Sequence, residues 1–79
     1  MKSFKDKVKE HRGILNLSQK QLAEKSGIGY RTITSYESGE RFPHSAQLYK
    51  LAKALGVSTE YLKNDEIDDP AYGLDRMEY

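Results

Sequence analysis

The chain has 79 residues, no cysteine and a formal net charge of +1. This length allows one small domain, and the lack of cysteine excludes disulfides and thiolate metal sites. No apolar run approaches the roughly 18 residues that a membrane span needs, and the first residues do not form a signal peptide. The composition therefore predicts a soluble, cytoplasmic protein.

The small net charge hides an uneven distribution along the chain. Residues 1–63 contain 12 Lys and Arg against 6 Asp and Glu, whereas residues 64–79 contain one Arg against 6 Asp and Glu. The two parts carry net charges of +6 and −5. Because phosphate contacts dominate DNA affinity, the basic part suits a polyanionic partner. An ordinary solvated surface is the alternative explanation of its charge.

A first helix is predicted over residues 3–16. Residues at helical spacing are predicted to face inward: Phe4, Val8, His11 or Arg12, and Leu15. The lysines between them are predicted to face outward: Lys5, Lys7 and Lys9. Asn16 is predicted to end this helix in a left-handed conformation.

Residues 18–38 predict two short helices joined by a tight turn. Ser18 and Gln21 form a capping box at the start of the first, and Gly27 stands where a left-handed residue would end it. The second helix is predicted over residues 29–38, and Gly39 ends it. Its inward-facing residues are predicted to be Ile33 and Tyr36.

Two more helices are predicted after a loop that ends at Pro43. The first begins at His44 or Ser45 and ends before Gly56. Its apolar stripe is Leu48, Leu51, Ala52 and Leu55. Ser58 then caps a short helix over residues 59–63, whose core residues are predicted to be Tyr61 and Leu62. Five helices without a strand predict a compact all-α domain.

These segments resemble the DNA-binding domain of phage-repressor-type (Cro/XRE) helix-turn-helix regulators. The likeness covers about residues 8–62 and is carried by LSQKQLAEKSGI, GYRTITSYESGERFP and LYKLAKALGVS. It implies a five-helix, lambda-repressor-like domain over residues 1–63. It also implies sequence-specific binding of double-stranded DNA and regulation of transcription, above all repression, in a bacterium or phage.

The helix over residues 29–38 is predicted to enter the major groove of DNA. Removing its inward residues leaves four predicted base contacts: Tyr30, Arg31, Thr34 and Ser35. Arg31 is the foremost of them, because its planar guanidinium can bond O6 and N7 of one guanine together. The alternatives are a phosphate contact for Arg31 and a place at the edge of the core for Tyr30.

The resemblance further implies contacts to the DNA backbone, which position the protein without reading sequence. The implied residues are Arg12, Ser18, Gln19, Thr32, Ser38, Gly39 and Arg41. In the family, the residue at the position of Gln19 also braces the first residue of the recognition helix, here Tyr30. The resemblance also implies an ion pair between Arg12 and Glu37, which joins the first helix to the recognition helix. Two separately solvated charges are the alternative.

No enzyme, cofactor or metal site is predicted. His11 and His44 are far apart in the chain and have no neighbouring acidic residues at metal-ligand spacing. The sequence also lacks a nucleophile elbow and a phosphate-binding loop.

Residues 64–79 are predicted to form an acidic tail or linker. Asp69 and Pro70 can open a further helix with Ala71, Leu74 and Met77 on one face. A frayed end is the favoured interpretation, and the start of a dimerisation or regulatory segment is the alternative.

The resemblance implies a palindromic operator and a homodimer on DNA, with the dimer contact in the last helix or the tail. A second interpretation of the whole chain stays open. It is a protein-interaction module, such as an antitoxin or an adaptor, that docks a protein partner, for example through the tail.

Overall fold

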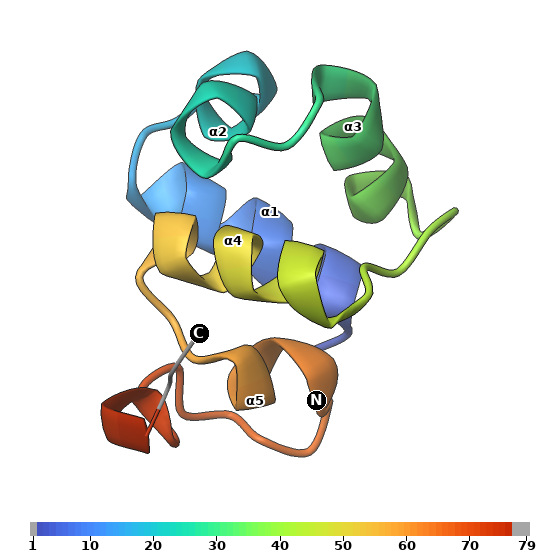
Figure 1. Cartoon of the computed structure of the whole chain (residues 1–79). Helices are drawn as coiled ribbons and strands as arrows, with labels where there is room; N and C mark the ends of the chain where they lie inside the picture. The colour runs from blue at the N-terminus through green and yellow to red at the C-terminus, as the bar shows by residue number, and fades with distance from the viewer. Residues whose placement is uncertain (1, 77–79) are drawn as a thin grey trace.

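The computed structural model describes residues 2–76 and contains five α-helices in that range. In chain order they are α1 (Phe4–Ile14), α2 (Gln19–Ser26), α3 (Tyr30–Ser38), α4 (Ser45–Leu55) and α5 (Thr59–Lys63), followed by the 3-10 turn η1 (Leu74–Arg76). In Figure 1, α2 and α3 lie at the top, α1 and α4 cross the middle, and α5 lies below. The predicted all-α architecture is confirmed.

The core takes one completely buried side chain from each helix: Val8, Leu22, Ile33, Leu51 and Leu62. Each such side chain contributes about 1.5–3 kcal/mol through removal of its apolar surface from water. The five helices therefore share one hydrophobic core, and none of them forms a separate unit. No helix among the described residues is long and apolar enough to cross a bilayer.

Both ends of α2 have the predicted local chemistry. Ser18 Oγ accepts from the backbone N–H of Gln21 at 3.0 Å, and the Ser18 N–H donates to Gln21 Oε1 at 2.8 Å. Gly27 ends α2 with a φ of +75°, a left-handed conformation that a side chain disfavours. Asn16 has a φ of +59° between α1 and α2, as predicted. The left-handed residues Asn16 and Gly27 therefore determine the short connections before and after α2.

Two predictions for α1 are wrong. The helix ends at Ile14, so Leu15 follows it and is 39% exposed. Lys7, predicted to face outward, is only 1% exposed. Position 7 lies one turn from Phe4 and therefore belongs to the inward face. The charge of Lys7 concealed this position, because a buried ammonium group needs partners that the sequence pattern does not display.

Lys7 finds these partners in the backbone at the C-terminal end of the domain. Its Nζ donates to the carbonyl oxygens of Tyr61 at 2.6 Å, Asn64 at 3.1 Å and Ile67 at 2.8 Å. It also lies 4.1 Å from the centroid of the Tyr61 ring. Burial lowers the pKa of Lys7, and the carboxylates of Asp65 and Asp68 oppose that shift. All three N–H bonds of the ammonium group are thus satisfied.

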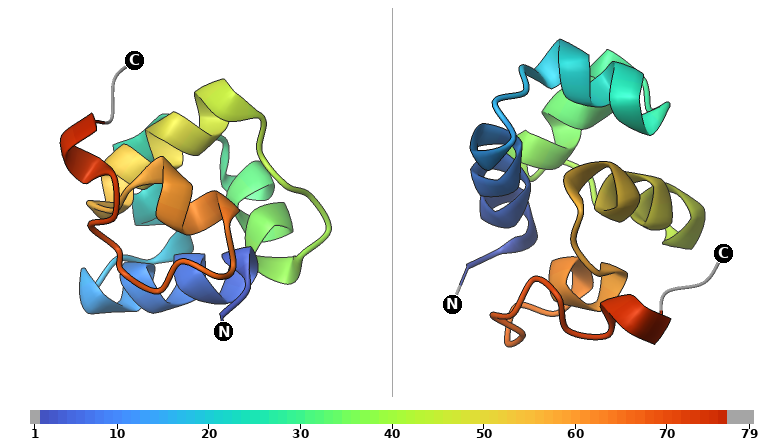
Figure 2. Two further views of the ribbon diagram at one scale, coloured as in Figure 1. Left: turned by 90° about the horizontal axis from the view of Figure 1, so that it is seen from below. Right: turned by 90° about the vertical axis from the view of Figure 1, so that its left-hand side faces the viewer.

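The first part of the acidic tail does not fray. It turns back beside α5 and α1, as both views of Figure 2 show. Ile67 packs against the core, and the Ser58 N–H donates to the Pro70 carbonyl at 2.8 Å. No α-helix follows Pro70 within the described residues: Asp69 Oδ1 accepts from the Ala71 N–H at 3.0 Å, as an N-cap residue does, but the chain then continues as turns and as η1. Met77 lies outside the described residues.

Candidate nucleic-acid interface

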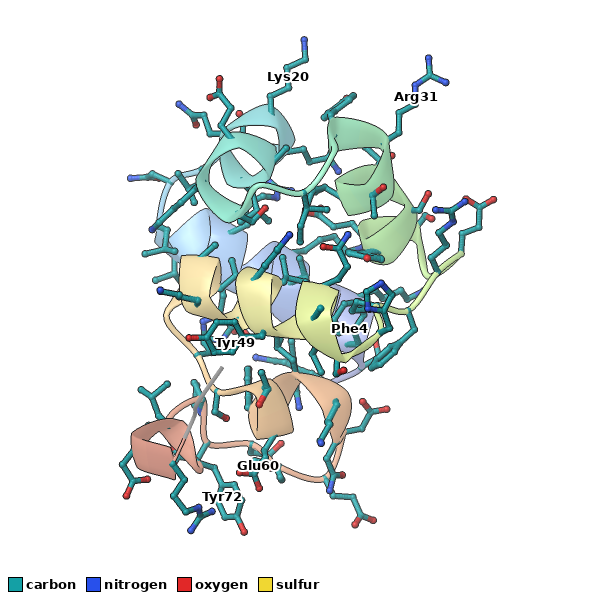
Figure 3. All side chains as sticks on the ribbon, viewed as in Figure 1. Phe4, Lys20, Arg31, Tyr49, Glu60 and Tyr72 are labelled. Atoms are coloured by element: carbon teal, nitrogen blue, oxygen red, sulfur yellow. The ribbon has the colours of Figure 1, made fainter. Side chains whose placement is uncertain are left out.

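The outer face of α3 carries the four predicted base-contacting residues. Tyr30 is 44% exposed, and Arg31 is exposed as well, whereas Thr34 and Ser35 are half-buried. Figure 3 shows the Arg31 side chain extending away from the body of the molecule. Within residues 2–76 its guanidinium group makes no ion pair or hydrogen bond. It is therefore free to meet an external partner.

The hydroxyl groups of Thr34 and Ser35 on this face are already engaged. Thr34 Oγ1 donates to the Arg31 carbonyl at 2.7 Å, a local bond one helical turn back along α3. Ser35 Oγ donates to Glu40 Oε1 at 3.2 Å. The four predicted residues consequently differ in availability, with Arg31 free and both hydroxyls held by neighbours.

Lys20 also belongs to this surface, although it was not among the predicted contacts. Its side chain extends from α2 in the same direction as Arg31 (Figure 3). Its Nζ lies 5.7 Å from the centroid of the Tyr30 ring, within the range of a cation–π interaction. The available signal was its place directly after Gln19, in the first turn of α2. The start of a helix presents free N–H groups and the positive end of its dipole, both of which attract anions.

A buried ionic network holds α3 against α1. Arg12 Nε donates to Glu37 Oε2 at 2.7 Å, and Arg12 Nη2 donates to Glu37 Oε1 at 2.9 Å. Glu37 is 5% exposed. The hydrogen bonds to Glu37 raise the pKa of Arg12, although burial opposes the shift. This two-point contact fixes the orientation of α3 as well as its distance from α1.

Gln19 extends the same network to α2. Its Nε2 donates to Glu37 Oε1 at 3.2 Å, so it braces Glu37 and not Tyr30, the partner that the family pattern implies. Arg12 Nη1 also donates a hydrogen bond to the Leu17 carbonyl, at 2.9 Å. Glu37 therefore receives donors from both α1 and α2, and the three helices of this surface are held together at one carboxylate.

The remaining residues predicted to contact phosphates surround α3. Ser18 forms part of the capping box, and Thr32 is half-buried in the first turn of α3. Ser38 Oγ donates to the Ser35 carbonyl at 3.0 Å, and the Gly39 N–H donates to the Tyr36 carbonyl at 3.3 Å. Arg41 is exposed in the loop after α3.

Ser18, Ser38 and Gly39 thus have local structural roles, so any contact of theirs with DNA would be additional. In the described part of the chain, no cluster of His, Asp or Glu is arranged to hold a metal ion.

Comparison with known proteins agrees with this geometry. A family model described as helix-turn-helix matches residues 8–62. An uncharacterized transcriptional regulator in the ATPase CF(0) region of Rhodospirillum rubrum is 36% identical over 67 residues, or 84% of this chain and 62% of the relative. The transcriptional repressor RstR of the cryptic phage CTXphi in Vibrio cholerae is 36% identical over 59 residues, or 75% of this chain and 53% of the relative.

The chain thus spans between 53% and 62% of the length of these two relatives. Among solved structures, it is similar to the P22 c2 repressor, crystallised with the synthetic operator 9T in the presence of Tl+. The TM-score is 0.78 at 26% sequence identity, and the match covers 84% of this chain and 100% of that one. The chain therefore belongs to the phage-repressor-type (Cro/XRE) helix-turn-helix family of transcriptional regulators.

Proposed function

We propose that this chain binds double-stranded DNA in a sequence-specific way and regulates transcription, with α3 in the major groove. One observation carries the proposal: the unpaired guanidinium of Arg31 stands on the outer face of a helix whose inner face is fixed by the Arg12–Glu37 ion pair. A rigid helix with a free, planar donor suits recognition of guanine. The kinship with a phage repressor supports repression as the direction of regulation.

The rest of the surface supplies contacts to the DNA backbone. The first turn of α2, with Gln19 and Lys20, faces one phosphate strand, and the loop containing Arg41 faces the other. Residues 1–63 carry a net charge of +6, so their attraction for DNA weakens as salt is added. The chain acts as a homodimer on a palindromic operator, with half-sites about 34–36 Å apart, and requires neither a cofactor nor a membrane.

The proposal is tested by selecting bound sequences from random duplex DNA at several salt concentrations. We expect an enriched palindromic motif, and Arg31→Ala should relax one position of each half-site at a cost of about 1–3 kcal/mol. Lys50→Ala, an equal change of charge at an exposed position of α4, is the matched control and should leave the motif unchanged. Weak binding with no enriched motif would contradict the proposal and favour the protein-interaction alternative.

The pair formed by Lys20 and Tyr30 offers a second test. Lys20→Ala should weaken binding to all sequences alike and reduce the slope of log affinity against log salt by about 1. A double-mutant cycle of DNA affinity with Tyr30→Ala should give a coupling energy different from zero, because the Tyr30 ring helps to position the Lys20 ammonium group. Lys25→Ala, at the other end of α2, is the matched control. Additive losses would show that the two residues bind DNA independently.

A further inference from the structure

Glu40 is a carboxylate in a place where two electrostatic effects oppose it. It lies directly after Gly39, the residue that ends α3, where the helix dipole is negative. If α3 enters DNA, the loop of Glu40 and Arg41 also approaches the phosphates, which repel an anion. A carboxylate here requires a donor that neither the helix end nor the DNA backbone provides.

Glu40 is nevertheless held firmly on the outer face of α3. Its backbone N–H donates to the Ser35 carbonyl at 3.0 Å and to Ser38 Oγ at 3.3 Å. Its Oε1 accepts from Ser35 Oγ at 3.2 Å. Both the main chain and the side chain of Glu40 thus turn back onto the last turn of α3. The second carboxylate oxygen makes no hydrogen bond or ion pair among residues 2–76.

We infer that Glu40, positioned by Ser35, reads a cytosine in the major groove; this inference rests on the proposed function. In that groove, base amino groups are the available donors, and the N4 amino group of cytosine is the usual partner of a glutamate. Ser35 lies four residues after Arg31 on the same face of α3. The two sites are therefore about 6 Å apart along the helix axis, or about two base-pair steps. Glu40 is a specificity residue, and Ser35 is its positioning residue.

The test is selection from random duplex DNA with the full chain and its variants. The wild type should enrich cytosine at one position of each half-site, about two base pairs from the position that depends on Arg31. Glu40→Ala should lose a roughly tenfold preference at that position alone, while the Arg31-dependent position stays. Glu40→Gln should shift the preference toward adenine, because an amide pairs with N6 and N7 of that base.

Two further variants separate the roles. Ser35→Ala should weaken the preference at the same position without moving it, since the carboxylate remains but loses its hydrogen bond. Glu24→Ala makes the same change of charge on an exposed residue of α2 and should leave every position of the motif unchanged. Melting temperatures of all variants show whether any loss comes from unfolding.

The outcomes are distinct. Glu40→Ala that binds every sequence more tightly, with the motif intact, would overturn the inference, because Glu40 would then only repel phosphates. A wild type that enriches a motif without this cytosine would overturn it as well and leave the proposed function standing. A wild type that enriches no motif at all would overturn the proposed function and, with it, the role of Glu40.

Discussion

Two cations of α1 lie five positions apart, Lys7 buried and Arg12 partly buried, and their charges are compensated in different ways. Arg12 meets the side-chain carboxylate of Glu37 on α3. Lys7 meets backbone carbonyls of Tyr61, Asn64 and Ile67 at the end of α5 and in the tail. The first contact anchors the proposed DNA-reading helix, and the second anchors the C-terminal segment. Helix α1 thus contacts both α3 and the C-terminal segment through a charged side chain.

The difference follows from the shapes of the two groups. The planar fork of arginine fits a carboxylate through two parallel bonds, whereas the ammonium group of lysine directs three donors to separate acceptors. Carbonyls at the end of a helix carry the negative end of its dipole, so a cation is favoured there. The arginine contact links two charges, and the lysine contact links a charge to dipoles. Removing Glu37 from the first contact and Lys7 from the second should therefore lower the free energy of unfolding by different amounts.

The largest effect is expected for Glu37→Ala, which leaves the guanidinium of Arg12 without its carboxylate. Breaking a buried ion pair on one side costs about 3–5 kcal/mol, a large part of the stability of a small domain. Urea unfolding should show this loss in the free energy of unfolding. The change in stability should exceed any change in base preference.

Glu24→Ala, an exposed position on α2, is the control and should stay within about 0.5 kcal/mol of the wild type. An unchanged melting temperature for Glu37→Ala would refute this account of the network.

A smaller and more local effect is expected for Lys7→Met, which keeps an unbranched but slightly shorter side chain and removes three hydrogen bonds. Only the bond to the Tyr61 carbonyl is fully buried, so its loss costs about 1–3 kcal/mol; the carbonyls of Asn64 and Ile67 are partly exposed and can bind water in place of Lys7. Hydrogen exchange should quicken first at the amides of Ser58 and Ile67, whose bonds depend on the folded-back tail. Lys9→Met, on the exposed side of α1, is the control. Uniform loss of protection across α2 and α3 would contradict a local role.

The smallest effect is expected from His11, which lies between these two cations. Its Nε2 is 2.9 Å from the Tyr61 hydroxyl, and burial lowers its pKa below 6.5. Glu10 opposes this shift, while the charges of Lys2 and Lys7 add to it. The unfolded chain thus takes up the proton more readily, so stability should fall as the pH drops below about 6.5.

Melting temperatures at pH 7.5 and 5.5 measure this dependence. His11→Gln should flatten it, whereas His44→Gln, at an exposed position, should preserve it. Equal pH dependence in the wild type and His11→Gln would show that other groups control this range.

The same comparison explains what the sequence could reveal. The helices, their caps and the core stripe follow from spacing and from residues such as Ser18 and Gly27, which act locally. Arg12 and Glu37 could be paired because the family resemblance implies that ion pair between two charged side chains. Lys7 could not be placed, because its partners are carbonyls that every residue possesses and only the three-dimensional fold selects.

The candidate interface shows a similar limit. The outer face of α3 followed from its helical period, and Arg31 was found in that way. The bond from Ser35 to Glu40 depends on how the chain turns after Gly39, and the contact of Lys20 with Tyr30 depends on how α2 and α3 cross. Neither is a property of one element. The sequence therefore indicated which helix is presented, but not which neighbours complete its surface.

The enclosure of Lys7 has a consequence for its chemical reactivity. An amine must be deprotonated and accessible to attack an acylating reagent, and Lys7 is 1% exposed with its hydrogens directed to three carbonyls. Lys5 and Lys9 flank it on the exposed side of the same helix. Brief acylation of the folded chain should thus modify these neighbours and spare Lys7. The slow labelling of Lys7 would then report how often the C-terminal segment leaves its place.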